Sequence, residues 1–214
     1  MACGRAWGFT PVLVIAGIVV ALAACSGPDF DARGLMAPSD YCPIDPRSLG
    51  EAEQLRPLDE GNGCQIPNPW RLRSVAGVRL DNGATLNCGV VQPLNNWMIG
   101  VAQPAALLAF GEPIRSARVA ASYSCRARNG VRGAKMSEHG FGNAIDLSEF
   151  TLTSGRTVTV AAGWRGDNEE RAFLRDLNRG ACEHFSTVLG PGSDRHHHDH
   201  FHLDLAPRKS SYCR

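Results

Sequence analysis

Two short stretches of the chain concentrate side chains that bind metal ions. The first is Ser137-Glu138-His139-Gly140-Phe141-Gly142-Asn143-Ala144-Ile145-Asp146, and the second is His198-Asp199-His200-Phe201-His202-Leu203-Asp204. They supply a His, an Asp seven residues later and a distant His-x-His pair. Such nitrogen and oxygen ligands suit one zinc ion. With only three protein ligands, such an ion keeps an open coordination position, which is typical of hydrolytic sites, so the two stretches predict a functional centre.

Both stretches have the alternating pattern of β-strands with one apolar face and one polar face. In the second stretch the apolar residues Phe201, Leu203 and Leu205 alternate with His200, His202 and Asp204, and in the first Ile145 and Leu147 alternate with Ala144 and Asp146. Residues two apart in a strand point the same way. We therefore expect the odd positions to face a core and the even positions to face a site.

The rest of the chain predicts a single α+β domain. Strand and helix patterns do not alternate regularly, which favours a central antiparallel sheet packed by helices. The expected elements are a helix over 90–110 that kinks or restarts at Pro104, a strand over 114–124, a basic loop over 126–135, a hairpin over 151–160 that turns at Ser154-Gly155, and a helix over 169–185 with Phe173, Leu174, Leu177 and Cys182 inward.

The N-terminus has the features of an export signal. Residues 1–24 contain Arg5 as their only charged side chain and end in an apolar run that is short for a membrane span. The sequence Leu22-Ala23-Ala24-Cys25 is similar to a bacterial lipoprotein signal, in which the cysteine is lipidated; an ordinary secretory signal is the alternative. We expect a signal peptide over 1–24, a lipid on Cys25, a tether over 25–55 and a domain over 56–214.

The charge balance argues against one class of function, and the cysteine content indicates disulfides. The chain has 22 Lys and Arg against 21 Asp and Glu, so removal of Arg5 with the signal leaves equal numbers. Without a basic field, nucleic-acid binding is excluded as a hypothesis. An even set of six cysteines in an exported chain indicates three disulfides, and the sequence alone does not choose among the roughly 15 pairings that six cysteines permit. Among these we expect Cys42–Cys64, Cys88–Cys125 and Cys182–Cys213.

The motif Ser137-x-His139-x-x-Gly142-x-Ala144-x-Asp146, together with His200-x-His202, resembles that of D-Ala-D-Ala carboxypeptidases and murein endopeptidases. The wider group includes lysostaphin and hedgehog domains, which share a His…Asp…His zinc site. More closely, the sequence from Tyr123-Ser124-Cys125-Arg126 through His200-Phe201-His202 to Cys213-Arg214 resembles the bacterial extensin-like C-terminal domain family over roughly residues 60–214. This resemblance implies a hedgehog-like zinc site on the sheet.

The resemblance also implies roles for individual residues. His139, Asp146 and His202 would be the zinc ligands, His200 would face the attacking water or the oxyanion, and Arg126 would bind a peptide carboxylate. One departure concerns the general base, because Asp199 stands where the carboxypeptidases have a Glu. We further expect Asp204 to orient a ligand histidine, Glu138 to be exposed, and His196, His197 and His198 to form a solvated loop.

Three functions remain open at this stage. The first is a zinc metallopeptidase of the cell envelope that cuts peptidoglycan stem peptides or crosslinks, with the exported monomer facing the periplasm or cell wall and held to the membrane through Cys25. The second is a zinc-stabilised peptidoglycan-binding lipoprotein without turnover. The third is a metal-capture strip over 196–202 that takes up several ions.

Overall fold

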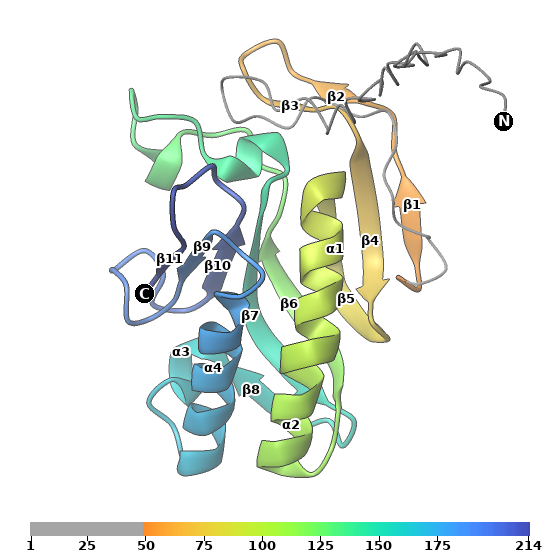
Figure 1. Cartoon of the computed structure of the whole chain (residues 1–214), viewed down its shortest axis with the longest axis vertical. Coiled ribbons are helices and arrows are strands. Elements are labelled where there is room, and N and C mark those ends of the chain that lie inside the picture. The colour runs from red at the N-terminus through yellow and green to blue at the C-terminus, as the bar shows by residue number, and fades with distance from the viewer. Residues whose placement is uncertain (1–48) are drawn as a thin grey trace, which may run out of the picture.

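A sheet of nine strands carries the fold, and the computed structural model describes residues 49–214 of the chain (Figure 1). Eight strands follow one another in the order β1-β4-β5-β6-β7-β10-β9-β11, and β8 pairs with β7. The bounds are β1 Ala52–Gln54, β4 Pro69–Val75, β5 Val78–Asn87, β6 Ile114–Ala121, β7 Ala144–Leu152, β8 Thr157–Thr159, β9 Thr187–Leu189, β10 Phe201–Asp204 and β11 Tyr212–Cys213. A small separate sheet pairs β2 Leu58–Asp59 with β3 Gln65–Ile66.

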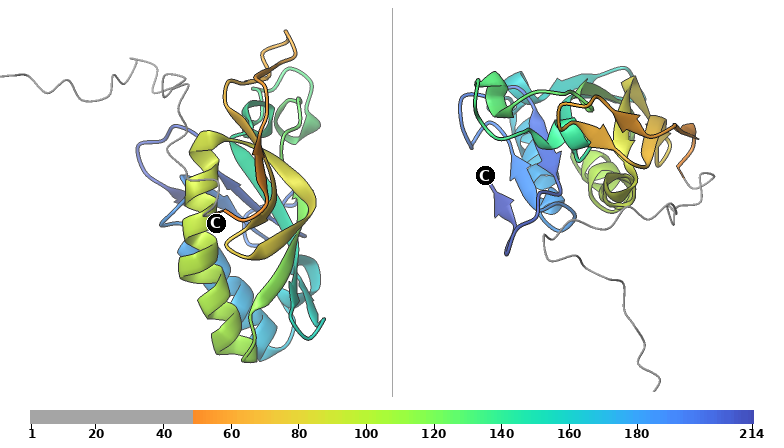
Figure 2. Two further views of the ribbon diagram at one scale, coloured as in Figure 1. Left: turned by 90° about the vertical axis from the view of Figure 1, so that its right-hand side faces the viewer. Right: turned by 90° about the horizontal axis from the view of Figure 1, so that it is seen from above.

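The sheet is mixed, which corrects the expectation of an antiparallel one. Most neighbours are antiparallel, but β5 pairs with β6 in parallel and β9 pairs with β11 in parallel. Between β5 and β6 the chain runs through a long helical segment, which is the kind of connection that parallel neighbours require. The single α+β domain expected from the sequence is confirmed, with helices gathered on one face of the sheet (Figure 2).

The first helical segment restarts beside Pro104, where the sequence predicts a kink or a restart. It consists of α1 Cys88–Trp97, the π-helical turn η2 Met98–Ala102 and α2 Gln103–Phe110. Pro104 has no N–H to give to the carbonyl four residues earlier, and Gln103 N bonds to Met98 O five residues back. The segment ends at Gly111, whose positive φ of 72° closes the last turn as expected.

The second long helix, α4 Asn168–Ala181, is shorter than the expected 169–185. Asp167 begins it by accepting a hydrogen bond from Glu170 N at 2.9 Å. Its Phe173, Leu174 and Leu177 are buried as predicted. The remaining helices are short: α3 Val160–Gly163, and the 3-10 turns η3 Arg128–Gly130 and η4 Glu138–Phe141.

Aromatic packing joins the helices to the sheet. Trp97 of α1 and Phe173 of α4 both contact Phe150 of β7, with ring centroids 6.5 and 5.6 Å from its own. Trp97 also donates its indole N–H to Leu177 O at 3.2 Å, so that its buried polar atom is satisfied. Fully buried Ile145, Leu147, Phe201 and Leu203 belong to the same core. Their alternating neighbours Asp146 and His202 therefore face away from the helices.

Two disulfides join segments that are distant from each other in the chain. Cys182–Cys213 is confirmed and ties the end of α4 to β11. The other two expected pairs are wrong, because Cys64 bonds to Cys125. Cys88 is also disulfide-bonded. Cys64 and Cys125 are 61 residues apart, and only the folded positions of β3 and of the segment after β6 bring them together.

The start of the described chain already belongs to the sheet. Leu49 is fully buried and β1 pairs with β4, although both lie within the stretch 25–55 expected as a tether. The expected signal peptide over 1–24, the lipidated Cys25 and the tether up to residue 48 lie outside the described residues. Within residues 49–214 no helix is long and apolar enough to span a membrane.

Gly142 occupies a position that only glycine fits well. Its φ is +59°, and an added Cβ would lie 2.5 Å from Ile66 Cδ1 and 2.9 Å from Asn87 N. We expect Gly142→Ala to reduce the free energy of unfolding by about 2 kcal/mol, measured by urea denaturation. Gly155→Ala is the matched control, because Gly155 also has positive φ but nothing lies within 4 Å of its added Cβ. An equal loss in both variants would contradict the steric explanation.

Candidate metal centre

Strand pairing brings together the two motifs found in the sequence. Asp146 of β7 and His202 of β10 are direct Cα partners across the antiparallel pair, although they are 56 residues apart in the chain. Asp146 Oδ1 lies 2.8 Å from His202 Nδ1. Both residues are buried. The predicted alternation along each strand is therefore confirmed, and it places these two side chains on the same face of the sheet.

His139 approaches the pair from the 3-10 turn η4, just before β7. Ser137 caps this turn by accepting a hydrogen bond from His139 N, and Gly142 ends it in the left-handed conformation. The imidazole donates from Nδ1 to Ser122 O at 2.6 Å, because a carbonyl oxygen can only accept. This bond directs the other ring nitrogen inward, where His139 Nε2 lies 3.1 Å from Asp146 Oδ2.

His202 is held between two carboxylates. Its Nδ1 faces Asp146, and its Nε2 lies 2.8 Å from Asp204 Oδ2. Asp204 Oδ1 in turn accepts from Ala206 N at 2.9 Å, which fixes the carboxylate. Asp204 thus orients the ring of His202, as expected from the sequence. Hydrogen bonds of this kind typically hold metal-ligand histidines in place.

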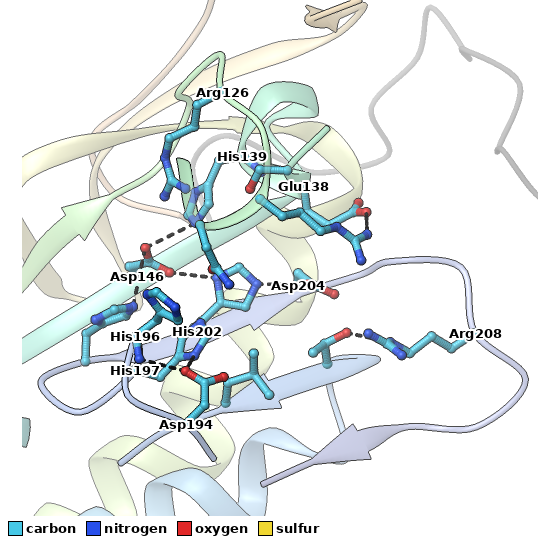
Figure 3. Close-up of a pocket in the computed structure, with 16 residues that line it drawn as sticks. Arg126, Glu138, His139, Asp146, Asp194, His196, His197, His202, Asp204 and Arg208 are labelled. Carbon is cyan, nitrogen blue, oxygen red and sulfur yellow. Dashed lines mark hydrogen bonds and ion pairs between the residues drawn. The ribbon is translucent and has the colours of Figure 1, made fainter. Parts of the chain in front are cut away.

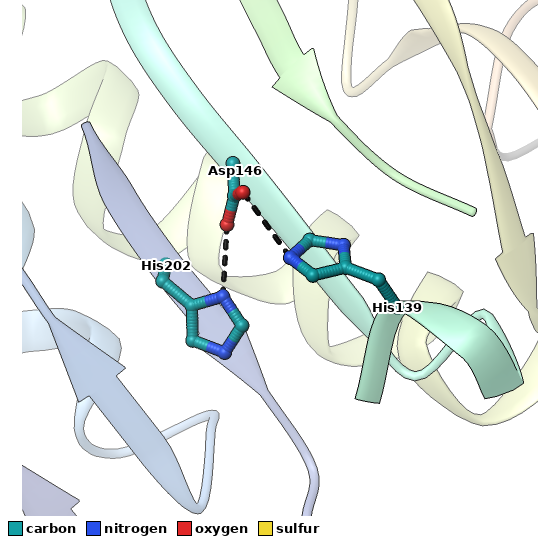
Figure 4. A group of neighbouring side chains, drawn as sticks. All are labelled: His139, Asp146 and His202. Atoms are coloured by element: carbon teal, nitrogen blue, oxygen red, sulfur yellow. Dashed lines mark hydrogen bonds and ion pairs between the residues drawn. The ribbon is translucent and has the colours of Figure 1, made fainter. Parts of the chain in front are cut away.

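We call His139, Asp146 and His202 the metal-ligand group (Figure 4). One candidate ligand atom from each lies within 4.8 Å of the others, and all three residues are buried. The Nδ1 of His139 is committed as a donor to Ser122 O, so Nε2 is the ring nitrogen that it offers to the group. The donor set therefore fits a bound divalent metal ion.

The charges of the group depend on one another. Burial by itself would raise the pKa of Asp146, but hydrogen bonds from His139 and His202 prevail and hold it well below its usual range. Burial would likewise lower the pKa of His202, but its hydrogen bonds to Asp146 and Asp204 raise it to about 9. At neutral pH without metal, His202 is therefore an imidazolium between two carboxylates.

This raised pKa predicts how metal affinity changes with pH. Binding of a metal through His202 Nδ1 must displace a proton, and the pKa to overcome is about 9. We expect the apparent affinity for Zn²⁺ to rise about tenfold per pH unit between pH 6 and pH 8, measured by competition with a fluorescent chelator. A plateau above about pH 6.5, the ordinary histidine value, would contradict this assignment.

The same shift predicts the pH dependence of the metal-free protein's stability. The pKa of His202 is about 9 in the folded state against roughly 6.5 unfolded, so its contribution is complete below pH 6.5 and is lost as pH rises towards 9. The expected loss is roughly 3 kcal/mol at most. Asp146 acts in the opposite direction, because its lowered pKa contributes stability that disappears as pH falls below about 4.

A cavity of about 390 Å³ opens onto the metal-ligand group (Figure 3). The two residues predicted to act on substrate, His200 and Arg126, both line it. His200 Nε2 lies 3.7 Å from Asp146 Oδ2, and its Nδ1 lies 2.8 Å from Asp199 Oδ1. Arg126 is half-buried at the rim. All five residues singled out in the two motifs and at position 126 therefore lie at one site.

His197 corrects the expectation of a fully solvated histidine loop. His196 and His198 are exposed as predicted, but His197 is only 9% exposed and packs against the rings of His200 and His202, with centroids 5.3 and 5.6 Å away. Burial lowers the pKa of His197, although its contact with Asp194 opposes this. The spacing Asp194-x-x-His197, which places both in one turn, is the signal that the sequence offered for this residue.

Glu138 was also expected to be exposed and is not. Its carboxylate accepts from Asn143 Nδ2 at 2.7 Å and from Arg128 Nη2 at 3.2 Å. Glu138 therefore ties the turn that carries His139 to the start of β7 and to the basic loop. This is a supporting role at the wall of the cavity.

Comparison with known proteins agrees with the resemblance seen in the sequence. The family described as extensin-like protein C-terminus matches residues 45–214. The chain belongs to this family. The match covers every described residue of the extensin-like domain, including the metal-ligand group and the cavity, and it begins ahead of β1. No curated protein matches the chain, and no solved structure does.

Proposed function

We propose that this extensin-like protein is a zinc metallopeptidase of the cell envelope that hydrolyses peptide bonds in peptidoglycan stem peptides or crosslinks. The observation that carries the proposal is the buried metal-ligand group opening onto a cavity that also contains His200 and Arg126. Three protein ligands leave room for water and substrate, as in hydrolytic zinc sites. The resemblance to D-Ala-D-Ala carboxypeptidases and murein endopeptidases, and through them to the hedgehog-type zinc fold, belongs to this proposal.

The ligands would be held by contacts already present in the protein. His139 would bind through Nε2, because Ser122 O keeps its Nδ1–H directed away. His202 would bind through Nδ1 while Nε2–H donates to Asp204. Bound zinc supplies a Lewis acid and lowers the pKa of a coordinated water to about 7. Asp146 completes the set with a carboxylate oxygen.

The remaining steps fall to His200 and Arg126. Asp199 accepts a hydrogen bond from His200 Nδ1, which directs Nε2 towards the metal-ligand group. His200 would accept a proton from the attacking water and deliver it to the leaving amine nitrogen, so that the products are a carboxylate and an amine. Arg126 would orient the peptide by binding a carboxylate with two parallel hydrogen bonds.

Export and anchoring complete the proposal. The signal over 1–24 and the lipid on Cys25 would place the domain at the membrane surface, facing the periplasm or cell wall, where peptidoglycan is accessible. The Cys64–Cys125 and Cys182–Cys213 disulfides support an exported location, because such bonds persist in oxidising compartments. We propose that the protein acts as a monomer.

The alternative is a non-catalytic, zinc-stabilised lipoprotein that binds peptidoglycan. One observation favours it: Asp199, at the position of the carboxypeptidase general base, has a half-exposed side chain and is engaged by His200. The four carboxylates that line the cavity are also engaged by side chains: Glu138 by Arg128, Asp194 by His197, and Asp146 and Asp204 by His202. No carboxylate lining this cavity is therefore free to act as a base.

A paired measurement separates the two functions. Zinc per chain is measured first, and the zinc-loaded protein is then incubated with purified sacculi, with chromatography of the soluble products. We expect about one zinc per chain and products of peptide-bond hydrolysis, either free amino acids and peptides or, after muramidase digestion, uncrosslinked muropeptides. A chelator should abolish both the bound zinc and the products, and zinc should restore them. Full zinc with retention on sacculi but no such product would establish the binding protein instead. Several ions per chain would favour metal capture by residues 196–202.

A further inference from the structure

The wall of the cavity carries two arginines that form no ion pair with a carboxylate among residues 49–214. Three arginines line it: Arg126, Arg128 and Arg208. Arg128 pairs with Glu138 at 3.2 Å. Within residues 49–214, neither Arg126 nor Arg208 has a carboxylate within ion-pair distance, although four acidic residues line the same cavity. These four are Glu138, Asp146, Asp194 and Asp204, and each is engaged by another side chain.

Arg208 is anchored in a way that leaves its binding edge available. It lies between β10 and β11, and its Nε donates to Thr187 Oγ1 at 2.8 Å. The guanidinium also lies 5.3 Å from the ring centroid of Tyr212. Among the described residues, no acceptor binds Nη1 or Nη2. A guanidinium fixed through Nε in this way presents its remaining donors to a planar anion, and a carboxylate matches their spacing.

Thr187, which anchors Arg208, is linked to the metal-ligand group through Asp204. Thr187 is 2% exposed and is the Cα partner of Asp204 across the β9–β10 pair. Asp204 bonds to His202 Nε2 at 2.8 Å. Arg208 is therefore hydrogen-bonded to Thr187, the strand neighbour of Asp204, and Asp204 orients His202. Arg126 comes from the segment after β6, and in the view of Figure 3 it lies beside His139 and Asp146, whereas Arg208 lies beyond His202 and Asp204.

We propose that Arg208 forms a second carboxylate subsite, so that the preferred peptide carries one carboxylate on each side of the bond placed at the metal-ligand group. This inference rests on the proposed peptide substrate and deepens it. Arg126 takes one carboxylate and Arg208 takes the other. A cavity of about 390 Å³ is at the small end of ligand pockets, so it accommodates a few residues of peptide between the two cations.

The test compares two peptides that differ by one carboxylate at nearly the same size. They are acetyl-D-glutamyl-D-alanyl-D-alanine and its D-glutaminyl counterpart. Binding is measured by calorimetry with zinc-loaded His200→Ala protein, so that neither peptide is consumed. We expect the glutamyl peptide to bind about tenfold more tightly, as for a hydrogen bond to a charged group. Adding Arg208→Gln should abolish this preference and leave the affinity for the glutaminyl peptide unchanged.

Two further variants identify the cause. Lys209→Gln removes the same charge from the next residue, which is exposed and lies outside the cavity lining, and it should retain the tenfold preference. Arg208→Lys keeps the charge but loses the planar fork, and it should retain only part of the preference. Equal affinity for both peptides, no binding of either, or a preference that survives Arg208→Gln would overturn the proposal.

The outcome is independent of whether the protein cleaves peptides. If sacculi yield no fragments but the glutamyl preference depends on Arg208, the peptidase function fails and the subsite stands. If fragments are released while the two peptides bind equally, the peptidase function stands and the subsite fails.

Discussion

Replacing Asp146 by Asn is expected to lower the affinity for zinc by about a thousandfold. The carboxylate bonds to both other members of the metal-ligand group, at 2.8 Å to His202 and 3.1 Å to His139. A neutral amide removes the negative charge that both imidazoles face and is a poor metal ligand. One of three protein ligands would account for roughly a third of a total of 10–16 kcal/mol, and a thousandfold corresponds to about 4 kcal/mol. Chelator competition measures the change.

The matched control is Asp199→Asn. Asp199 contacts His200 rather than the group itself, and its side chain is 52% exposed. The control makes the same chemical change three residues from His202 and should retain zinc within a few fold. If Asp146→Asn binds zinc as tightly as the wild type, the assignment of the metal centre is wrong, and the proposed function falls with it.

Replacing His200 by Ala is expected to lower the rate of peptide cleavage by 10²- to 10⁴-fold, the usual contribution of a general acid–base residue. Zinc content should not change, because His200 Nε2 stays 3.7 Å from Asp146, beyond a hydrogen bond, and lies outside the metal-ligand group. The measurement is the rate of peptide-bond hydrolysis in sacculi, with zinc per chain determined on the same sample. Loss of turnover with metal retained would assign proton transfer to His200.

His198→Ala is the control for this variant. It removes an imidazole two residues away whose side chain is 71% exposed, and it should leave turnover unchanged. If His200→Ala cleaves at the wild-type rate, another group moves the proton. Loss of zinc in His200→Ala would instead mean that this histidine is a ligand.

The strand patterns of the two motifs predicted which faces carry Asp146 and His202, and the family resemblance implied that His139 joins them. Alternation along 144–147 and 200–205 placed Asp146 and His202 on polar faces, and the pairing of β7 with β10 brought these faces together. The restart of the helix beside Pro104 and its stop at Gly111 were equally predictable, because a missing N–H and a left-handed glycine act locally. Local rules suffice wherever the cause and the effect lie within one turn or one strand.

Features that depend on distant packing could not be predicted in this way. The Cys64–Cys125 pair depends on the position of the small β2–β3 sheet, which no local pattern specifies. The parallel β5–β6 pair depends on the path of the helical connection across the sheet. His197 looked solvated among three consecutive histidines, and only the fold shows that its ring packs on His200 and His202. The position of Arg208 at the cavity could not be predicted, because it depends on a hydrogen bond to Thr187, 21 residues earlier.

The Cys64–Cys125 bond has a consequence for when the site becomes complete. Cys125 directly precedes Arg126, and Ser122, three residues earlier, holds the ring of His139. In the reducing cytosol the two cysteines would stay as thiols. The segment that carries Ser122 and Arg126 would then have no covalent link to Cys64. Under the export and peptidase function proposed above, we expect a newly made chain to be inert until it has been exported and oxidised, which would protect the cell's own peptides during synthesis.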